Sequence, residues 1–203
     1  MPASLQREPS ELQGTAAGGG TGGGSGGVAA VTGIDAATWG RGRHAPRWST
    51  VAFDRILVDA PCSSERHIIQ GAEDGVWSRS RLKRDAALQS AILRNGARLL
   101  SVGGRLVYST CSLADEENDG VVSKLIGHKR HGAGLALVDA LGGPLAEASI
   151  APLMHGVERT ECGALMLPDR SRFGPLYWAV IKRHSSAGCA AEDEEEMSLG
   201  HDL

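Results

Sequence analysis

Two cysteines and two aspartates each follow a short apolar stretch of the sequence, where reactive side chains could be brought together. Asp35 follows the first stretch, Asp59 and Cys62 the second, and Cys111 the third. Because no histidine falls at ligand spacing beside them, this set suits a thiolate nucleophile better than a metal, and we expect no metal site. Taken singly, each has an ordinary explanation as a small core cysteine or as an aspartate in a turn or helix cap. The hypothesis of a reaction centre rests on their combination.

The elements that would position these residues alternate between strands and helices. The apolar pattern predicts strands at 28–32, 53–59 and 105–109, a helix from Ser80 to Leu100 ended by Gly103 and Gly104, a helix from Asp115 to Ile126, and later strands at 135–138 and 175–182. The first strand–helix–strand–helix series implies a parallel sheet, whose ligand crevice lies beyond the carboxyl ends of its strands. Asp35, Asp59, Cys62 and Cys111 would meet there.

Composition sets the expected boundaries of the folded part. The run Gly18 to Gly27 and the acidic run Glu192 to Glu196 predict disorder over 1–27 and 185–203, which leaves 28–184 as one domain. The formal net charge of -3 gives no overall attraction to nucleic acid. The sequence shows neither a membrane span nor an import signal, and its four dispersed cysteines favour reduced thiols in an intracellular compartment.

Two of these segments resemble the cysteine motifs of the Nop/Sun RNA cytosine-5 methyltransferases. FDRILVDAPCSSER at 53–66 carries Cys62 after Val-Asp-Ala-Pro, and GGRLVYSTCSL at 103–113 carries Cys111 and is followed by Glu117 and Asn118. VTGIDAATWG at 31–40, Glu65-Arg66-His67 and GALMLPDRSRFGPLYWAVIKR at 163–183 resemble the branch that methylates mitochondrial ribosomal RNA. The resemblance implies mitochondria, with cytoplasm or nucleus as the alternatives.

The same resemblance implies a fold. It is an α/β fold, a partial class I (Rossmann-like) methyltransferase fold with a mostly parallel sheet, helices on both faces, and the first strands missing. The family's first nucleotide-binding strand and its Pro-Gly-Gly-Lys-type loop are not recognisable before Val28, and the Gly18 to Gly27 run has no apolar strand before it and no lysine after it. We therefore expect this chain to bind S-adenosylmethionine too weakly for calorimetry.

The chemistry of the family explains the thiols. Carbon 5 of cytosine accepts a methyl group only after a nucleophile has added to carbon 6, and the resemblance implies that Cys111 is this nucleophile. Since a free cysteine has a pKa of about 8.5, the site must favour the thiolate or protonate the base as the bond forms. By resemblance, Asp59 contacts the edge of the cytosine and the methyl-bearing end of S-adenosylmethionine, Asp35 contacts the adenine end, and Cys62 assists release of the product.

An RNA substrate would present its cytosine unpaired or flipped out of the stack. Phosphates could be held by a group of basic residues that are equally consistent with a solvated surface, namely Arg79, Arg81, Lys83 and Arg84, together with Arg41, Arg43 and Arg47. Two other functions stay open. One is a catalytically inactive remnant that binds RNA or a protein partner. The other is a cysteine hydrolase using Cys62 and His67, for which the sequence offers no oxyanion signature.

Overall fold

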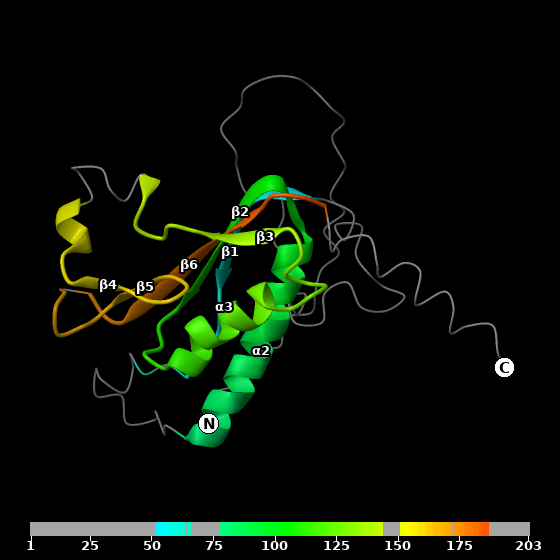
Figure 1. Cartoon of the computed structure of the whole chain (residues 1–203). Helices are drawn as coiled ribbons and strands as arrows, with labels where there is room; N and C mark the ends of the chain where they lie inside the picture. Colours follow the sequence, from blue (N-terminus) through cyan, green and yellow to red (C-terminus); the bar gives the residue numbers. More distant parts are fainter. Residues whose placement is uncertain (1–51, 64, 66–77, 144–150, 172, 187–203) are drawn as a thin grey trace, which may run out of the picture. The chain divides into compact units, whose positions relative to one another are not determined.

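The computed structural model describes residues 52–63, 65, 78–143, 151–171 and 173–186 (Figure 1). The chain divides into two units, Met1–Gly33 and Ile34–Leu203, and every described residue belongs to the second. Four parts of the sequence analysis lie outside the described residues: the expected strand at 28–32, Asp35, the basic loop at 41–48 and His67. In the part that the structure describes, no helix is long and apolar enough to cross a membrane.

Strands β1 (Phe53–Asp59) and β2 (Leu100–Thr110) pair in parallel, and helix α2 (Arg79–Arg98) lies between them in the sequence. Ser78 begins the helix because its hydroxyl accepts a hydrogen bond from the backbone N–H of Arg81 at 3.2 Å. The predicted strand at 53–59 is confirmed at both ends, and a helix is confirmed within the range from Ser80 to Leu100.

The expected role of Gly103 and Gly104 as a helix stop is wrong, because both lie inside β2. The helix ends at Arg98, and β2 begins two residues later. The pairing of β1 with β2 shifts register between Phe53 and Arg55, and Gly103 has a φ of 83°, which favours glycine. The glycines therefore mark an irregularity within the strand.

The sheet is mixed, which corrects the expectation of a mostly parallel one. Its order is β1-β2-β6-β5-β4, with β3 paired to β6. The later strands are β3 (Leu135–Val138), β4 (Val157–Arg159), β5 (Ala164–Met166) and β6 (Leu176–Arg183). Among the described pairings, β1–β2 is the parallel one, and β6 runs antiparallel to β2, β3 and β5. An apolar run such as Leu176–Arg183 does not specify strand direction, so the expected parallel arrangement is wrong for β3 and β6.

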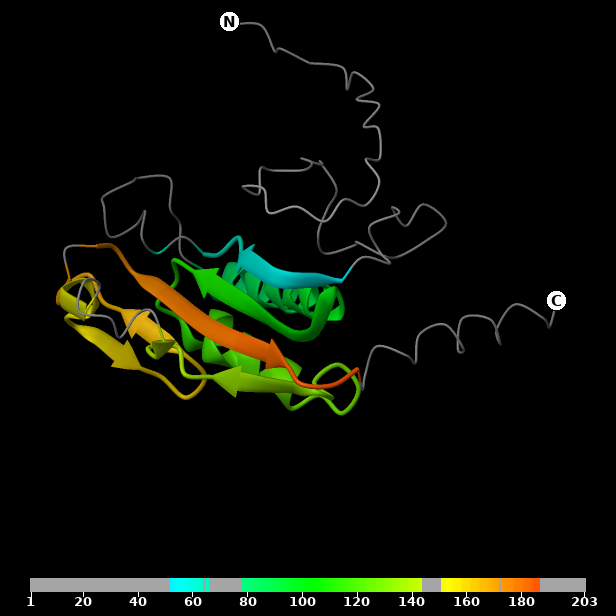
Figure 2. The same ribbon diagram turned by 90° about the horizontal axis from the view of Figure 1, so that it is seen from above.

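Both described α-helices, α2 and α3 (Asp119–Ile126), cover the same face of the sheet (Figure 1, Figure 2). Their apolar side chains form one core with the strands, which includes Leu93, Val122, Leu106, Tyr108 and Ile181. On the other face, Trp178 and Met166 pack with Met154 of the short 3-10 helix η4 (Ala151–Met154). Among the described residues, the expected α-helices are therefore present on one face only, because β4, β5 and β6 return antiparallel instead of through crossover helices.

The helix expected from Asp115 to Ile126 is interrupted. It consists of a 3-10 turn, η2 (Asp115–Glu117), followed by α3, with Asn118 at the junction in a non-helical conformation. The interruption lets two consecutive polar residues turn inward, since Glu117 is 0% and Asn118 is 3% exposed. These two side chains reach the candidate site.

Asp119, the first residue of α3, connects that helix to the hairpin formed by β4 and β5. The sequence patterns did not predict this hairpin. The Asp119 carboxylate accepts hydrogen bonds from the hydroxyl of Thr160 and the backbone N–H of Glu161, each at 2.8 Å, and from the hydroxyl of Tyr177 at 2.7 Å. Burial, followed by the hydrogen bond to Asp119, raises the pKa of Tyr177, so its hydroxyl stays a donor. The two strands are only three residues long, which gives periodicity little to detect.

Candidate active site

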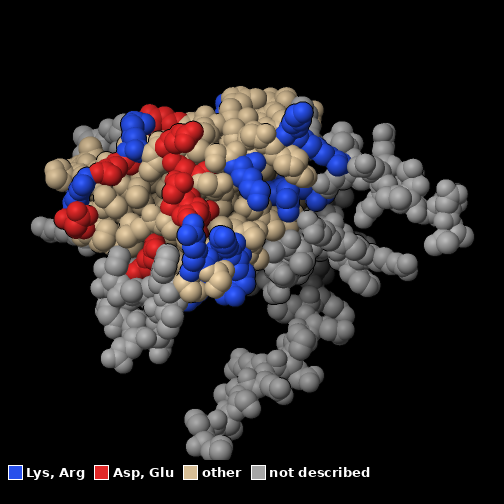
Figure 3. Space-filling view, turned by 60° about the horizontal axis from the view of Figure 1, so that its bottom comes forward, with Lys and Arg blue, Asp and Glu red and all other residues tan. Residues whose placement is uncertain are grey.

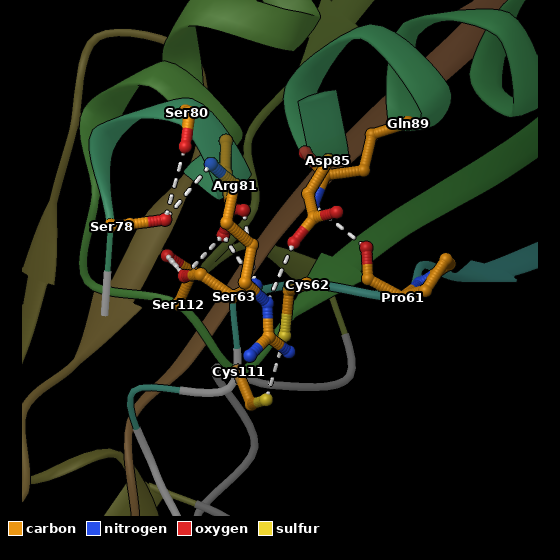
Figure 4. A network of polar contacts seen from close by, with 11 residues as sticks. Pro61, Cys62, Ser63, Ser78, Ser80, Arg81, Asp85, Gln89, Cys111 and Ser112 are labelled. Carbon is orange, nitrogen blue, oxygen red and sulfur yellow. Dashed lines mark hydrogen bonds and ion pairs between the residues drawn. The ribbon is translucent and has the colours of Figure 1, made fainter. Parts of the chain in front are cut away.

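The structure brings together the two cysteines that the sequence singled out. Asp59 at the end of β1 pairs with Ser109 in β2, and the backbone N–H of Ala60 donates to the carbonyl of Ser109 at 3.0 Å. Cys62 and Cys111 follow within three residues of this pair, and their Sγ atoms lie 2.8 Å apart (Figure 4). Both side chains are half-buried. The carboxyl ends of two adjacent parallel strands thus present a pair of thiols, as Figure 4 shows.

Asp59 lies at the same end of the sheet and is exposed. The hydroxyl of Ser109 donates to its Oδ1 at a long 3.4 Å. A carboxylate can accept about four hydrogen bonds, so Asp59 keeps acceptor capacity for a ligand.

The backbone on both sides of Cys62 is held by buried side chains. The amide of Gln89 in α2 donates to the carbonyl of Pro61 at 2.8 Å. The Glu117 carboxylate accepts from the backbone N–H of Ser63 at 3.0 Å and from its hydroxyl at 2.9 Å. Gln89 and Glu117 are both 0% exposed. Neither residue was assigned a role from the sequence.

The neighbours of Cys111 are held in a similar way by Asn118. The Thr110 hydroxyl donates to Oδ1 of Asn118 at 2.6 Å, and Nδ2 of Asn118 donates to the carbonyl of Ser112 at 2.9 Å. The Asn118 amide therefore holds both the residue before Cys111 and the residue after it. Glu65 adds a connection to the Cys62 segment, because its Oε2 accepts a hydrogen bond from the Ser112 hydroxyl at 3.1 Å.

A third described cysteine differs from this pair. Cys162 is 6% exposed, and burial together with the nearby charge of Asp119 raises its pKa to about 11. It therefore stays a thiol near neutral pH. Within the described ranges, no three His, Cys, Asp or Glu side chains are arranged to hold a metal ion.

The basic residues expected to hold RNA lie along the first turns of α2. Arg79, Lys83 and Arg84 are exposed, whereas Arg81 is partly buried and pairs with Asp85 at 3.4 Å. On the face that Figure 3 presents, Lys and Arg side chains fall into separate groups with a band of Asp and Glu side chains between them. This face is not a single basic surface.

An α/β sheet with two thiols at the carboxyl ends of parallel strands defines a protein suited to covalent, thiol-based chemistry. Its family follows from comparison with known proteins. The model of the family described as "16S rRNA methyltransferase RsmB/F" matches residues 33–158. The chain therefore belongs to this family of S-adenosylmethionine-dependent RNA cytosine-5 methyltransferases. The resemblance inferred from the two cysteine motifs is confirmed.

Individual relatives differ in the RNA that their names specify. The chain is 32% identical to the 5-cytosine rRNA methyltransferase nsun-4 of Caenorhabditis elegans, over 65% of this chain and 29% of the relative. It is 29% identical to the mitochondrial tRNA (cytosine(34)-C(5))-methyltransferase of Mus musculus, over 71% of this chain and 41% of the relative. The chain thus spans less than half the length of these curated relatives.

The fold is also found among solved structures. The crystal structure of PH0851 matches with a TM-score of 0.51 and 26% identity, over 64% of this chain and 26% of that chain.

Proposed function

We propose that this chain is the catalytic part of an S-adenosylmethionine-dependent RNA cytosine-5 methyltransferase that acts on ribosomal RNA. The observation that carries the proposal is the 2.8 Å approach of the Cys62 and Cys111 thiols in a chain of the RsmB/F family. A single buried cysteine needs no catalytic explanation, whereas two half-buried thiols at a strand edge suit nucleophilic addition and elimination.

Cys111 is the nucleophile in this proposal. The Sγ of its thiolate forms a bond to carbon 6 of the cytosine, the electrons of the carbon 5–carbon 6 double bond form a carbon 4–carbon 5 double bond, and nitrogen 3 takes the proton of the Asp59 carboxyl. Carbon 5 would then take the methyl group of S-adenosylmethionine, which departs as S-adenosylhomocysteine. The proton on carbon 5 leaves, its bonding electrons restore the carbon 5–carbon 6 double bond and expel the thiolate of Cys111, and nitrogen 3 returns its proton to Asp59. Cys62 assists this elimination by accepting the proton, for which its position beside Cys111 is suitable.

Asp59 is the described residue that fits the edge of the base and the methyl-bearing end of the donor. It is exposed, it lies at the same strand end as the thiols, and its 3.4 Å bond from Ser109 leaves acceptor positions open. The exposed Arg79, Lys83 and Arg84 of α2 are the described candidates for phosphate contacts, and they would hold an unpaired or flipped cytosine near the strand ends.

The proposal of ribosomal RNA is supported by the family description and by the nematode relative. Mitochondrial location is a further part of the proposal, supported by the name of the mouse relative, which is a mitochondrial enzyme. Because that relative's name specifies a transfer RNA, the substrate must be tested with both RNA classes.

The decisive experiment measures transfer of a labelled methyl group from S-adenosylmethionine to RNA. Because the chain spans less than half the length of its curated relatives, the assay uses an extended version, joined to the remaining part of such a relative's catalytic domain. In the extended version we expect label at carbon 5 of cytosine in ribosomal RNA transcripts and none after Cys111→Ser. Cys162→Ser is the matched control, since that thiol lies in the core, away from the pair. Full turnover by Cys111→Ser would refute the assignment of the nucleophile. RNA binding without any methyl transfer would favour the non-catalytic alternative.

A further inference from the structure

We propose that three buried side chains, Gln89, Glu117 and Asn118, are positioning residues that hold the thiols of Cys62 and Cys111 next to each other. They act through the backbone of the residues beside the cysteines. The inference deepens the proposed function, and it rests on that function only where it treats these thiols as catalytic.

The segment that carries Cys62 needs such support because it lies beyond the strand pairing. The N–H of Ala60 still bonds to β2, but Pro61 has no N–H to donate and is exposed. Two backbone groups that flank Cys62 are held by side chains instead. Gln89 reaches the carbonyl of Pro61 from α2, and Glu117 reaches the N–H of Ser63 from the η2–α3 junction. These contacts fix the residue before Cys62 and the residue after it.

The buried carboxylate of Glu117 makes any other position of the Cys62 segment energetically costly. A buried polar or charged group is costly unless donors satisfy it, and Glu117 is fully buried. Ser63 supplies two donors, its backbone N–H at 3.0 Å and its hydroxyl at 2.9 Å. Moving the Cys62 segment would break both bonds and leave a buried carboxylate unsatisfied.

Asn118 performs the corresponding task for Cys111 with a single side chain. Its Oδ1 accepts from Thr110, and its Nδ2 donates to the carbonyl of Ser112, so the amide fixes the residues on both sides of the thiol. Since Glu117 and Asn118 are consecutive, one short junction holds both cysteine segments. Tyr108 of β2 anchors that junction, because its hydroxyl donates to the backbone carbonyl of Glu117 at 2.6 Å.

The test measures how readily the two thiols join, in a reaction that uses neither RNA nor methyl donor. In buffers of reduced and oxidised glutathione, the two thiols convert one oxidised glutathione into two reduced molecules and become a disulfide. The equilibrium constant of this reaction gives the effective concentration of one thiol beside the other. That concentration depends on how closely the protein holds the two Sγ atoms together. The full chain is used with Cys189→Ser, and peptide mapping identifies the Cys62–Cys111 disulfide.

Gln89→Met is the sharpest variant because it conserves side-chain volume. It removes the bond to Pro61, and it also removes the buried Oε1 of Gln89, which has no hydrogen-bond partner among the described residues. We therefore expect the melting temperature to stay near that of the parent chain, while the effective concentration falls about tenfold. Asn118→Leu, which loses both of its bonds, and Glu117→Gln, which loses the charge, should also lower it.

Two controls separate positioning from general stability. Ser90→Ala removes a side-chain hydrogen bond to Ala86 within α2, next to Gln89 but without contact to Pro61. Leu135→Ala removes core contacts in β3, which pairs with the part of β6 that faces the middle of β2 (Arg105 to Val107) and not Thr110. Both should leave the equilibrium constant unchanged, although Leu135→Ala lowers the melting temperature.

An equilibrium constant for Gln89→Met within about twofold of the parent value would overturn the proposal. A fall of the same size in Leu135→Ala would also overturn it. If Glu117→Gln or Asn118→Leu does not fold, Gln89→Met decides. A normal equilibrium constant in every variant would leave the proposed methyltransferase activity untouched, and loss of thiol pairing in Gln89→Met would support positioning even if no methyl transfer were found.

Discussion

The Sγ atoms of Cys62 and Cys111 lie 2.8 Å apart although 49 positions separate the two residues in the chain. The parallel pairing of β1 with β2 causes this proximity, because it aligns Asp59 with Ser109 and places both cysteines just past the aligned pair. The thiols can therefore meet only after α2 has returned the chain to the start of β2. Their proximity is a property of the folded sheet, not of either cysteine motif alone.

Because Cys111 adds to carbon 6 and Cys62 assists the later elimination, Cys62→Ala should stop the reaction after addition. In the extended version supplied with S-adenosylmethionine and ribosomal RNA, Cys111 should still attack carbon 6, whereas elimination would slow because the neighbouring base is gone. We expect RNA to remain covalently attached and to migrate with the protein on a denaturing gel. The double variant Cys62→Ala, Cys111→Ser should carry no RNA. Attached RNA in the double variant would contradict the assignment of Cys111.

Asp59→Asn should reduce methyl transfer without altering stability. The side chain is exposed and, within the described part of the chain, accepts a single long bond from Ser109, so little folding energy depends on it. Loss of a group that protonates the base lowers turnover by about 10²–10⁴-fold in comparable reactions. The matched control is Asp54→Asn, an exposed aspartate at the other end of β1. Equal turnover rates for Asp59→Asn and the parent protein would remove Asp59 from the mechanism.

Cys162 should be the least reactive of the three described cysteines. Its pKa is raised to about 11, and a raised acid pKa means that the neutral thiol persists until the pH approaches that value. At pH 8 about one molecule in a thousand would carry the thiolate. Alkylation by iodoacetamide followed by peptide mapping should therefore find Cys162 unmodified at pH 8 and increasingly modified toward pH 11. Rapid labelling of Cys162 at pH 8 in the folded chain would contradict its buried position.

Asp119→Ala should be strongly destabilising, because four polar groups lose their acceptor at once. The affected donors are the hydroxyls of Thr160 and Tyr177 and the backbone N–H groups of Glu161 and Cys162. We expect the free energy of unfolding to fall by about 2–4 kcal/mol, as measured by urea denaturation. Asp115→Ala, an exposed neighbour in η2, is the control and should change it by less than about 0.5 kcal/mol. A small effect of Asp119→Ala would mean that water replaces these bonds.

The sequence predicted the elements with the strongest patterns. The bounds of β1 and β3 agree residue for residue, and the cysteine motifs identified the family. The mixed sheet could not be predicted in the same way, because an apolar strand such as β6 looks alike in either direction. The short strands β4 and β5 carry too few residues for a periodic signal.

The supporting residues of the site were missed for a different reason. Gln89 lies on the buried face of α2 with Leu82 and Leu93, at a helical spacing where an apolar residue is expected. A polar residue at such a position was the available signal that a buried backbone group needed a donor. The target of that donor, the carbonyl of Pro61, is 28 positions away and follows only from the three-dimensional structure.

The register of β1 and β2 also limits how the length of this segment can change in evolution. Gln89 and Glu117 hold the residues on both sides of Cys62, and Asn118 holds those beside Cys111, so one inserted or deleted residue between Asp59 and Cys62, or between Ser109 and Cys111, would move a thiol away from its partner. The contacts of the described residues place no such constraint on the length of the connection between Glu65 and Ser78. Related chains should therefore gain and lose residues in that connection while the spacing beside each cysteine stays fixed.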